Sequence, residues 1–144
     1  MGTSLLSLFK SFSPPGLALV DRQDLQALVN VSASGASGTS ATVGGTAASS
    51  TQLTASFSQI DTSTGAGTDS VTLPPAHTGQ NCVVFNNTAN TIKLWANPAN
   101  QDNGGAADAI IDHGATGSGG TSITIATNVC QELYCMKAGI WKAV

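Results

Sequence analysis

The second half of the chain constrains the fold more than any other feature. From Asp69 to Val144, short runs of alternating apolar and polar residues are interrupted by Pro, Gly and Asn clusters at intervals of about eight to twelve residues. This spacing is typical of strands joined by turns. The pattern therefore predicts a mostly β fold, an antiparallel β sandwich or barrel of about eight strands, to which an extended N-terminal arm and one short helix are attached.

Alternation within this half indicates which side chains face the core. The side chains expected to point inward recur with a period of two: Val71, Leu73, Ile92, Leu94, Ile123, Ile125, Val129, Leu133 and Cys135. Trp95 falls on the face opposite to Leu94. The run from Cys82 to Phe85 is continuously apolar, which is typical of a strand covered on both faces.

The composition changes twice along the chain and divides it into three segments. Residues 51–144 are expected to form the β domain, whose first strand places three apolar side chains on one face: Leu53, Ala55 and Phe57. Residues 31–50 contain mainly Gly, Ser, Ala and Thr, so we predict a flexible linker or an extended arm. Such a stretch would be ordered only if a sheet or another subunit held its backbone. We expect residues 1–30 to form an apolar arm with a short helix.

The first 30 residues contain more apolar side chains than a short segment can bury by itself. Asp21 can cap a helix from Arg22 to about Val29, but two helical turns are marginal without a surface to pack on. We therefore predict that this segment docks on a partner subunit, and the chain's own β domain is the alternative receptor. The predicted partner-binding residues are apolar: Leu5, Leu6, Leu8, Phe9, Phe12, Leu25, Leu28 and Val29.

Charged residues make up only 9% of the chain, compared with roughly 25% in soluble domains. The net charge is −3 and the five cations are scattered, which argues against a nucleic-acid partner. No apolar run approaches the roughly eighteen residues of a membrane span, so we expect no membrane partner. A surface of small polar residues is easily desolvated and favours the packing of many copies side by side.

No pattern in the sequence predicts catalytic, cofactor-binding or metal-binding residues. The glycine-rich stretch from His113 to Thr121 superficially resembles a phosphate loop, but Gly120 stands where the lysine is required and a strand pattern follows. The acidic and histidine residues nearby match neither calcium nor zinc spacing: Asp102, Asp108, Asp112 and His113. We therefore predict that the protein is not an enzyme and holds no cofactor.

The cysteines and tryptophans leave more than one interpretation open. Cys82, Cys130 and Cys135 lack metal-site spacing and are expected to be small core residues, with the last two on opposite faces of one strand. A disulfide between two of them is the alternative. Trp95 and Trp141 are expected to anchor the core or a subunit interface. The alternative is that these tryptophans lie beside polar loops and contact a glycan.

Four groups of residues in the second half recur together in one kind of protein. The groups are, in order, Val71-Thr72-Leu73-Pro74-Pro75-Ala76 with Gly79, Val83-Val84-Phe85-Asn86-Asn87 with Asn90-Thr91-Ile92, Asn103-Gly104-Gly105-Ala106-Ala107, and Lys137-Ala138-Gly139-Ile140-Trp141. In order and spacing this half of the chain resembles small bacteriophage virion proteins: capsid decoration (cement) proteins, head fibres and tail-fibre tips. The loop from Trp95 to Asp102 departs from their pattern, so a surface formed by that loop need not be shared.

The resemblance implies a non-enzymatic structural role in a virion. We expect a capsid decoration or cement subunit that stabilises the shell through subunit contacts, and the alternative is a head-fibre or tail-fibre module that binds a host glycan. The expected partners are copies of the chain, in a homotrimer, and the major capsid protein or other virion subunits. The first residues lack the features of a secretory signal, so we expect assembly in the host cytoplasm and residence in the virion.

Overall fold

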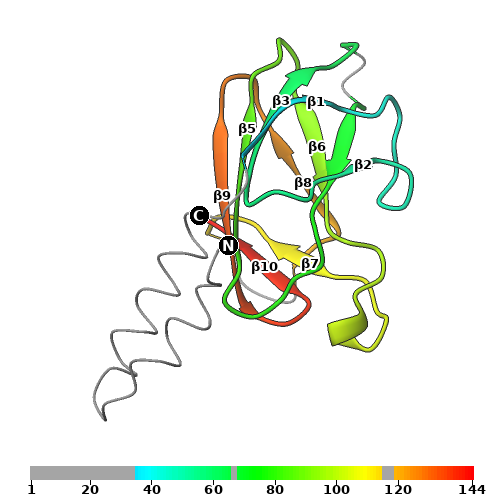
Figure 1. The fold of residues 1–144 in the computed structure, drawn as a ribbon, viewed down its shortest axis with the longest axis vertical. Coiled ribbons are helices and arrows are strands. Elements are labelled where there is room, and N and C mark those ends of the chain that lie inside the picture. The colour runs from blue at the N-terminus through cyan, green and yellow to red at the C-terminus, as the bar shows by residue number, and fades with distance from the viewer. Residues whose placement is uncertain (1–34, 66–67, 115–118) are drawn as a thin grey trace, which may run out of the picture. The chain divides into compact units, whose positions relative to one another are not determined.

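The structure, a computed structural model, describes residues 35–65, 68–114 and 119–144. The predicted apolar arm and the predicted helix from Arg22 to Val29 lie outside these residues. The described residues form a mostly β structure (Figure 1), which confirms the fold class at that level. The helix that they contain is one turn of 3-10 helix, η1 (Gln101–Asn103), in the loop between two strands.

The strands belong to two sheets. Sheet A has six strands in the order β1-β3-β5-β9-β10-β7, and sheet B has four in the order β2-β4-β6-β8. The strand bounds are β1 Gly35–Ser40, β2 Thr51–Gln52, β3 Phe57–Thr62, β4 Ser70–Thr72, β5 Asn81–Asn86, β6 Ile92–Trp95, β7 Ala109–Ile111, β8 Ser122–Ile125, β9 Cys130–Lys137 and β10 Ile140–Ala143.

Both sheets are mixed, so the prediction of antiparallel sheets is wrong. The pairs β1–β3, β3–β5, β2–β4, β4–β6 and β7–β10 are parallel, and only β5–β9, β9–β10 and β6–β8 are antiparallel. The first six strands alternate between the sheets. Each parallel neighbour is therefore reached through a strand of the opposite sheet, which serves as the crossover connection. The sequence pattern of short strands and turns is the same whether the next strand pairs with the preceding one or enters the opposite sheet, so it could not reveal the parallel pairing.

The core lies between the two sheets. Sheet A contributes the fully buried Ile60, Val84, Leu133 and Trp141, together with Cys82, Ile110, Cys135 and Ala143. Eight residues that the alternation predicted as inward-facing are buried, which confirms those predictions: Val71, Leu73, Ile92, Leu94, Ile123, Ile125, Leu133 and Cys135. The prediction for Val129 is wrong: it is 40% exposed, because it precedes β9 and does not share the alternation of that strand.

Phe57 is an exception to the predicted alternation. Leu53 and Ala55 are buried, but Phe57 is exposed, and Ile60 is the buried residue of β3. The predicted strand from Thr51 to Asp61 is in fact two strands in different sheets. The chain crosses from one layer to the other between them, and this crossing resets the phase of the alternation.

Part of the stretch predicted to be a flexible linker or an extended arm, residues 35–40, is a strand of sheet A. β1 pairs in parallel with β3, and the backbone N–H of Gly38 donates a hydrogen bond to the carboxylate of Asp61 at 2.6 Å. Gly38 has a φ of 76° and lies at an irregularity in the pairing. The low-complexity composition therefore does not prevent order here, because the backbone of β3 provides the hydrogen bonds.

The loop that follows β1 covers the outer face of sheet B. Ser50 Oγ lies 2.6 Å from Ser70 Oγ, and Thr72 Oγ1 donates to the carbonyl oxygen of Ala47 at 2.9 Å. The indole N–H of Trp95 donates to Gly45 at 3.1 Å. The whole of β4 is buried as a result, although Ser70 and Thr72 point away from the core.

Asn86 joins the two sheets at one end of the core. Its side chain is fully buried, and its Nδ2 donates to the carbonyl oxygens of Ile125, at 3.0 Å, and Asn90, at 2.8 Å. Its Oδ1 accepts from the backbone and the hydroxyl of Thr88. The side-chain amide of Asn86 therefore has hydrogen-bond partners within the protein for both its nitrogen and its oxygen. This is the condition under which a polar side chain can be buried in the core.

Candidate functional site

The outer face of sheet A exposes large apolar side chains. Phe57 is 47% exposed, Tyr134 41% and Met136 80%, while Val83 and Phe85 are half-buried. We call these five residues the open face. The sequence pattern predicted that the strand containing Val83 and Phe85 would be covered on both faces. Among the described residues its inner side is covered and its outer side is not.

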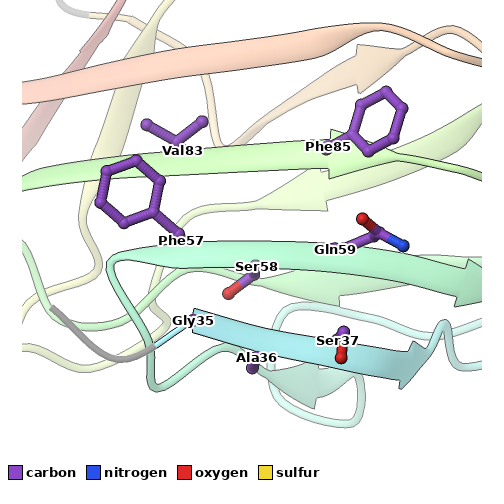
Figure 2. A pocket seen from close by; sticks show the side chains of 8 residues that line it. All are labelled: Gly35, Ala36, Ser37, Phe57, Ser58, Gln59, Val83 and Phe85. Carbon is purple, nitrogen blue, oxygen red and sulfur yellow. The ribbon is translucent and has the colours of Figure 1, made fainter.

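Strand register brings these side chains together. Phe57 of β3 is the direct neighbour of Val83 on β5, and β5 pairs in turn with β9, which contributes Tyr134 and Met136. Figure 2 shows Phe57, Val83 and Phe85 on the same side of their two strands. On β9 the register places Glu132 beside Val83 and Tyr134 beside Asn81, so the apolar side chains of β3 and β5 and those of β9 lie on one side of the sheet with polar residues between them.

Part of the open face is hollowed. A hollow of about 360 Å³ lies over β1, β3 and β5. Its lining contains no charged residue and consists of Gly35, Ala36, Ser37, Phe57, Ser58, Gln59, Val83 and Phe85. Because β1 has only small side chains here, the aromatic ring of Phe57 is not shielded by its neighbour strand. An apolar group of a partner can enter such a hollow at little desolvation cost.

One carboxylate lies within this surface. Glu132 of β9 is opposite Val83, and its Oε2 accepts a hydrogen bond from the hydroxyl of Tyr134 at 3.1 Å. This hydrogen bond and the charge of Glu132 raise the pKa of Tyr134, so the phenol stays protonated and remains a donor. The pair places a polar group at the centre of the face, where it can orient a partner.

The two tryptophans lie in different environments, and neither is on the open face. Trp141 is fully buried in the core, so its ring is not accessible to a glycan or to another subunit in this structure. Trp95 is half-buried on the outer side of sheet B, where the ammonium of Lys93 lies 4.1 Å from the ring centroid. That ring is therefore already in contact with the chain on one face and through its N–H.

Polar residues that were weighed as metal ligands, among them Asp102 and Asp108, form hydrogen bonds and a surface pair with residues of the loops instead. The carboxylate of Asp108 is buried, and it accepts from the backbone N–H of Ala76 at 2.8 Å and from Asn100 Nδ2 at 2.9 Å. Asp102 pairs with His77 at the surface. No cluster of three or more His, Cys, Asp or Glu side chains suited to a metal ion occurs in the described part of the chain.

The cysteines differ sharply in accessibility. Cys82 and Cys135 are buried as predicted, and burial raises the pKa of Cys82 to about 12. Burial also raises the pKa of Cys135. Cys130 is exposed at the start of β9, opposite Phe85, so its prediction as a core residue is wrong. Its thiol is a native probe at the edge of the open face.

The open face was not predicted from the sequence as a site. Phe57 was expected on the same face as Leu53 and Ala55, and Tyr134 and Met136 were not among the predicted contact residues. The unbroken apolar run from Cys82 to Phe85 was the available indication, because it implies a cover on both sides of β5. The predicted partner-binding residues of the arm and helix lie outside the described residues.

No protein-family model matches the chain, and no match is found among curated proteins or solved structures. Within residues 35–65, 68–114 and 119–144, no helix has the length and apolar character required to cross a membrane.

Proposed function

We propose that the chain is a bacteriophage virion structural protein, a capsid decoration or cement subunit that stabilises the shell through subunit contacts. The observation that supports this most directly is the open face, an apolar surface spanning three strands in a chain with few charges. Monomeric proteins rarely leave contiguous aromatic and aliphatic side chains uncovered, and such patches mark interaction sites. The resemblance of the second half to phage decoration proteins is consistent with the same role.

The proposed mechanism is mechanical. Each contact removes apolar surface from water, at about 25 cal/mol per Å². A subunit that contacts several neighbours adds this free energy across the boundaries between capsid proteins, and the shell then resists internal pressure. We further propose that the apolar arm and predicted helix contact the major capsid protein, and that the chain assembles as a homotrimer in the virion.

The test compares particles with and without the protein. Phage shells are stripped, the full-length protein is added back, and DNA release is followed by dye fluorescence during heating. We expect the protein to raise the release temperature and to co-sediment with the shells. The variant Leu5→Ser/Leu8→Ser/Phe9→Ser should lose both effects, while the control Ser4→Ala/Ser7→Ala/Ser11→Ala retains them. Unchanged release temperature with the wild-type protein would refute the proposal.

The alternative function, a fibre module that binds a host glycan, receives less support from the geometry. Trp95 is contacted by Lys93 and by the loop containing Gly45, and Trp141 is buried. A glycan array with the wild-type protein and Trp95→Ala separates the two functions. Binding that disappears in the variant would favour the alternative.

A further inference from the structure

We propose that residues 42–50, which we call the strap, open as a local unit over the outer face of sheet B while the core between the two sheets stays folded. The strap connects β1 to β2, and it is the loop between these two strands in Figure 1. In the structure it is closed. This inference concerns a movement within the chain and does not depend on the proposed function.

Both ends of the strap are fixed. Ala41, just before it, is buried in the core, and its backbone N–H donates to the carbonyl oxygen of Thr62 in β3 at 2.9 Å. Leu53, just after β2, is also buried, and its backbone N–H donates to the carbonyl oxygen of Thr72 in β4 at 2.8 Å. The chain between these two anchors can therefore move without detaching either end from its sheet.

Hydrogen bonds, rather than packed apolar side chains, hold the strap to sheet B. Residues 42–50, which the structure describes in full, bury no apolar side chain, and Val43 is 56% exposed. The carbonyl oxygen of Gly45 accepts from the indole of Trp95, and that of Ala47 accepts from the hydroxyl of Thr72. Water can replace each of these bonds, so each contributes little net stability. A segment with few buried apolar contacts opens at a lower free energy than the core.

The closed strap depends on one close contact. Ser50 Oγ lies 2.6 Å from Ser70 Oγ, and a Cβ at position 45 would lie 2.4 Å from the first hydroxyl and 2.5 Å from the second. Only a glycine fits against this pair. The preceding Gly44 has a φ of 59°, a conformation that glycine adopts at little cost. The two glycines therefore form a tight bend that a small displacement can separate from β4.

Opening would expose a row of hydrogen-bonding groups on sheet B. Strand register places Gln52, Thr72 and Trp95 side by side on its outer face. The strap also forms one wall of a second hollow, of about 350 Å³, whose lining residues are all uncharged. The strap is thus a lid that controls access to this polar, uncharged face.

Deuterium exchange of the two indole N–H protons, followed by NMR on the full-length protein, tests the opening directly. The N–H of Trp95 donates to the strap, whereas that of Trp141 is buried in the core. The Trp95 proton should exchange at least about a hundredfold faster, and low urea should not change its rate, because opening of the strap exposes little surface. Equal rates with the same urea dependence would show that the strap opens only when the whole protein unfolds, which would overturn the inference.

A disulfide that locks the strap gives the control. In a Cys130→Ser background, Ser50→Cys/Ser70→Cys places two thiols where the hydroxyls are in contact, and the other two cysteines are buried. The oxidised variant should exchange the Trp95 proton at least about tenfold more slowly than the same variant after reduction. Equal rates in the two forms would show that the proton exchanges without movement of the strap, and the inference would be wrong.

Gly45→Ala gives a test that needs no disulfide. Its methyl group pushes the strap away from the hydroxyl pair, so the Trp95 proton should exchange about tenfold faster, the factor expected for the loss of one hydrogen bond. Gly35→Ala is the matched control, because its Cβ meets no atom within 4 Å, and it should leave the rate unchanged. An unchanged rate in Gly45→Ala would also overturn the inference.

Discussion

The outer faces of the two sheets differ in whether the described part of the chain covers them. Sheet B is covered by the chain itself, through hydrogen bonds from a loop of small polar residues to Ser70, Thr72 and Trp95. Sheet A has no such cover among the described residues and exposes Phe57 and Met136 instead. The side chains on each face match this difference, since sheet B presents hydroxyl groups to its cover, whereas sheet A presents large aromatic and aliphatic groups together with polar residues such as Glu132.

This difference shows that a strand's apolar pattern can predict a cover on both faces without showing whether that cover comes from the same chain or from a partner. The continuous apolar run of β5 is typical of a strand covered on two sides, whereas β4 is buried on both sides although its sequence, Ser70-Val71-Thr72, alternates. For β4 the second cover is the loop that includes Gly45 and Ser50, and it lies in the same chain. For β5 no second cover is found within residues 35–65, 68–114 and 119–144, and an exposed apolar surface is where a partner gains most by binding.

The largest expected effect concerns the core that both sheets share. Trp141→Ala should lower the free energy of unfolding by about 3–5 kcal/mol, because it empties a fully buried site between the sheets. Trp95→Ala should cost about 1–2 kcal/mol, since it removes one hydrogen bond and part of the contact with the loop. Urea unfolding followed by circular dichroism measures both.

Trp141→Phe is the matched control for the core variant. It retains an aromatic ring and removes an indole N–H that has no hydrogen-bond partner among the described residues. We therefore expect a smaller loss than for Trp141→Ala. A loss for Trp95→Ala as large as that for Trp141→Ala would show that the cover of sheet B is as important as the core.

The second effect tests the cover of sheet B with a single methyl group. A Cβ at Gly45 would lie 2.4 Å from Ser50 Oγ and 2.5 Å from Ser70 Oγ, so Gly45→Ala must displace the hydroxyl pair that joins the loop to β4. We expect a loss of about 1–3 kcal/mol. Gly35→Ala, in the hollow of the open face, meets no atom within 4 Å and should change stability by less than about 0.5 kcal/mol. Equal losses in the two variants would contradict the contrast between a covered and an open face.

The third effect separates the two faces of a single strand. Ile60→Ala removes a fully buried side chain of β3 and should cost about 2–5 kcal/mol, as a core truncation does. Phe57→Ala, three residues earlier, should cost about 1 kcal/mol or less in the monomer, because the ring is about half exposed. The measurement is the thermal unfolding midpoint at low protein concentration. A loss for Phe57→Ala as large as that for Ile60→Ala would mean that Phe57 belongs to the core after all.

The sequence predicted the core better than the path of the chain. The period of two identified Val71, Leu73, Ile92 and Leu94 as inward-facing because alternation depends only on which side of a strand is buried. It did not reveal that consecutive strands enter different sheets, since a turn between paired strands and a turn between layers use the same Gly, Pro and Asn residues. The parallel pairing of β3 with β5 is therefore visible only in the structure.

The open face was unpredictable for a related reason. Phe57 follows Leu53 and Ala55 in phase, and only the crossing between β2 and β3 turns it outward. Tyr134 and Met136 alternate with buried residues of β9, as exposed polar residues usually do, so nothing in their spacing separated them from a solvated surface. Their grouping depends on the pairing of β5 with β9 across about 50 residues of chain, which the alternation within each strand does not specify.

The smallest expected effect concerns the edge of the open face and depends on pH. The hydrogen bonds from Asn87, Gln59 and the backbone N–H of Gly38 hold the pKa of Asp61 below its ordinary value. Because this pKa is lower in the folded state than in the unfolded state, the contribution of Asp61 to stability is present above the unfolded pKa, near 4. It decreases as the pH falls through the folded value.

The urea midpoint of wild type should therefore exceed that of Asp61→Asn at pH 6, and the difference should shrink at pH 3. Asn87→Ala removes the donor with the largest influence on the carboxylate, so the pH dependence should be weaker in that background. A difference that is the same at both pH values would show that Asp61 does not hold β1 through its charge. In that case the small side chains of β1, which form one wall of the hollow, would be held by the backbone pairing with β3 alone.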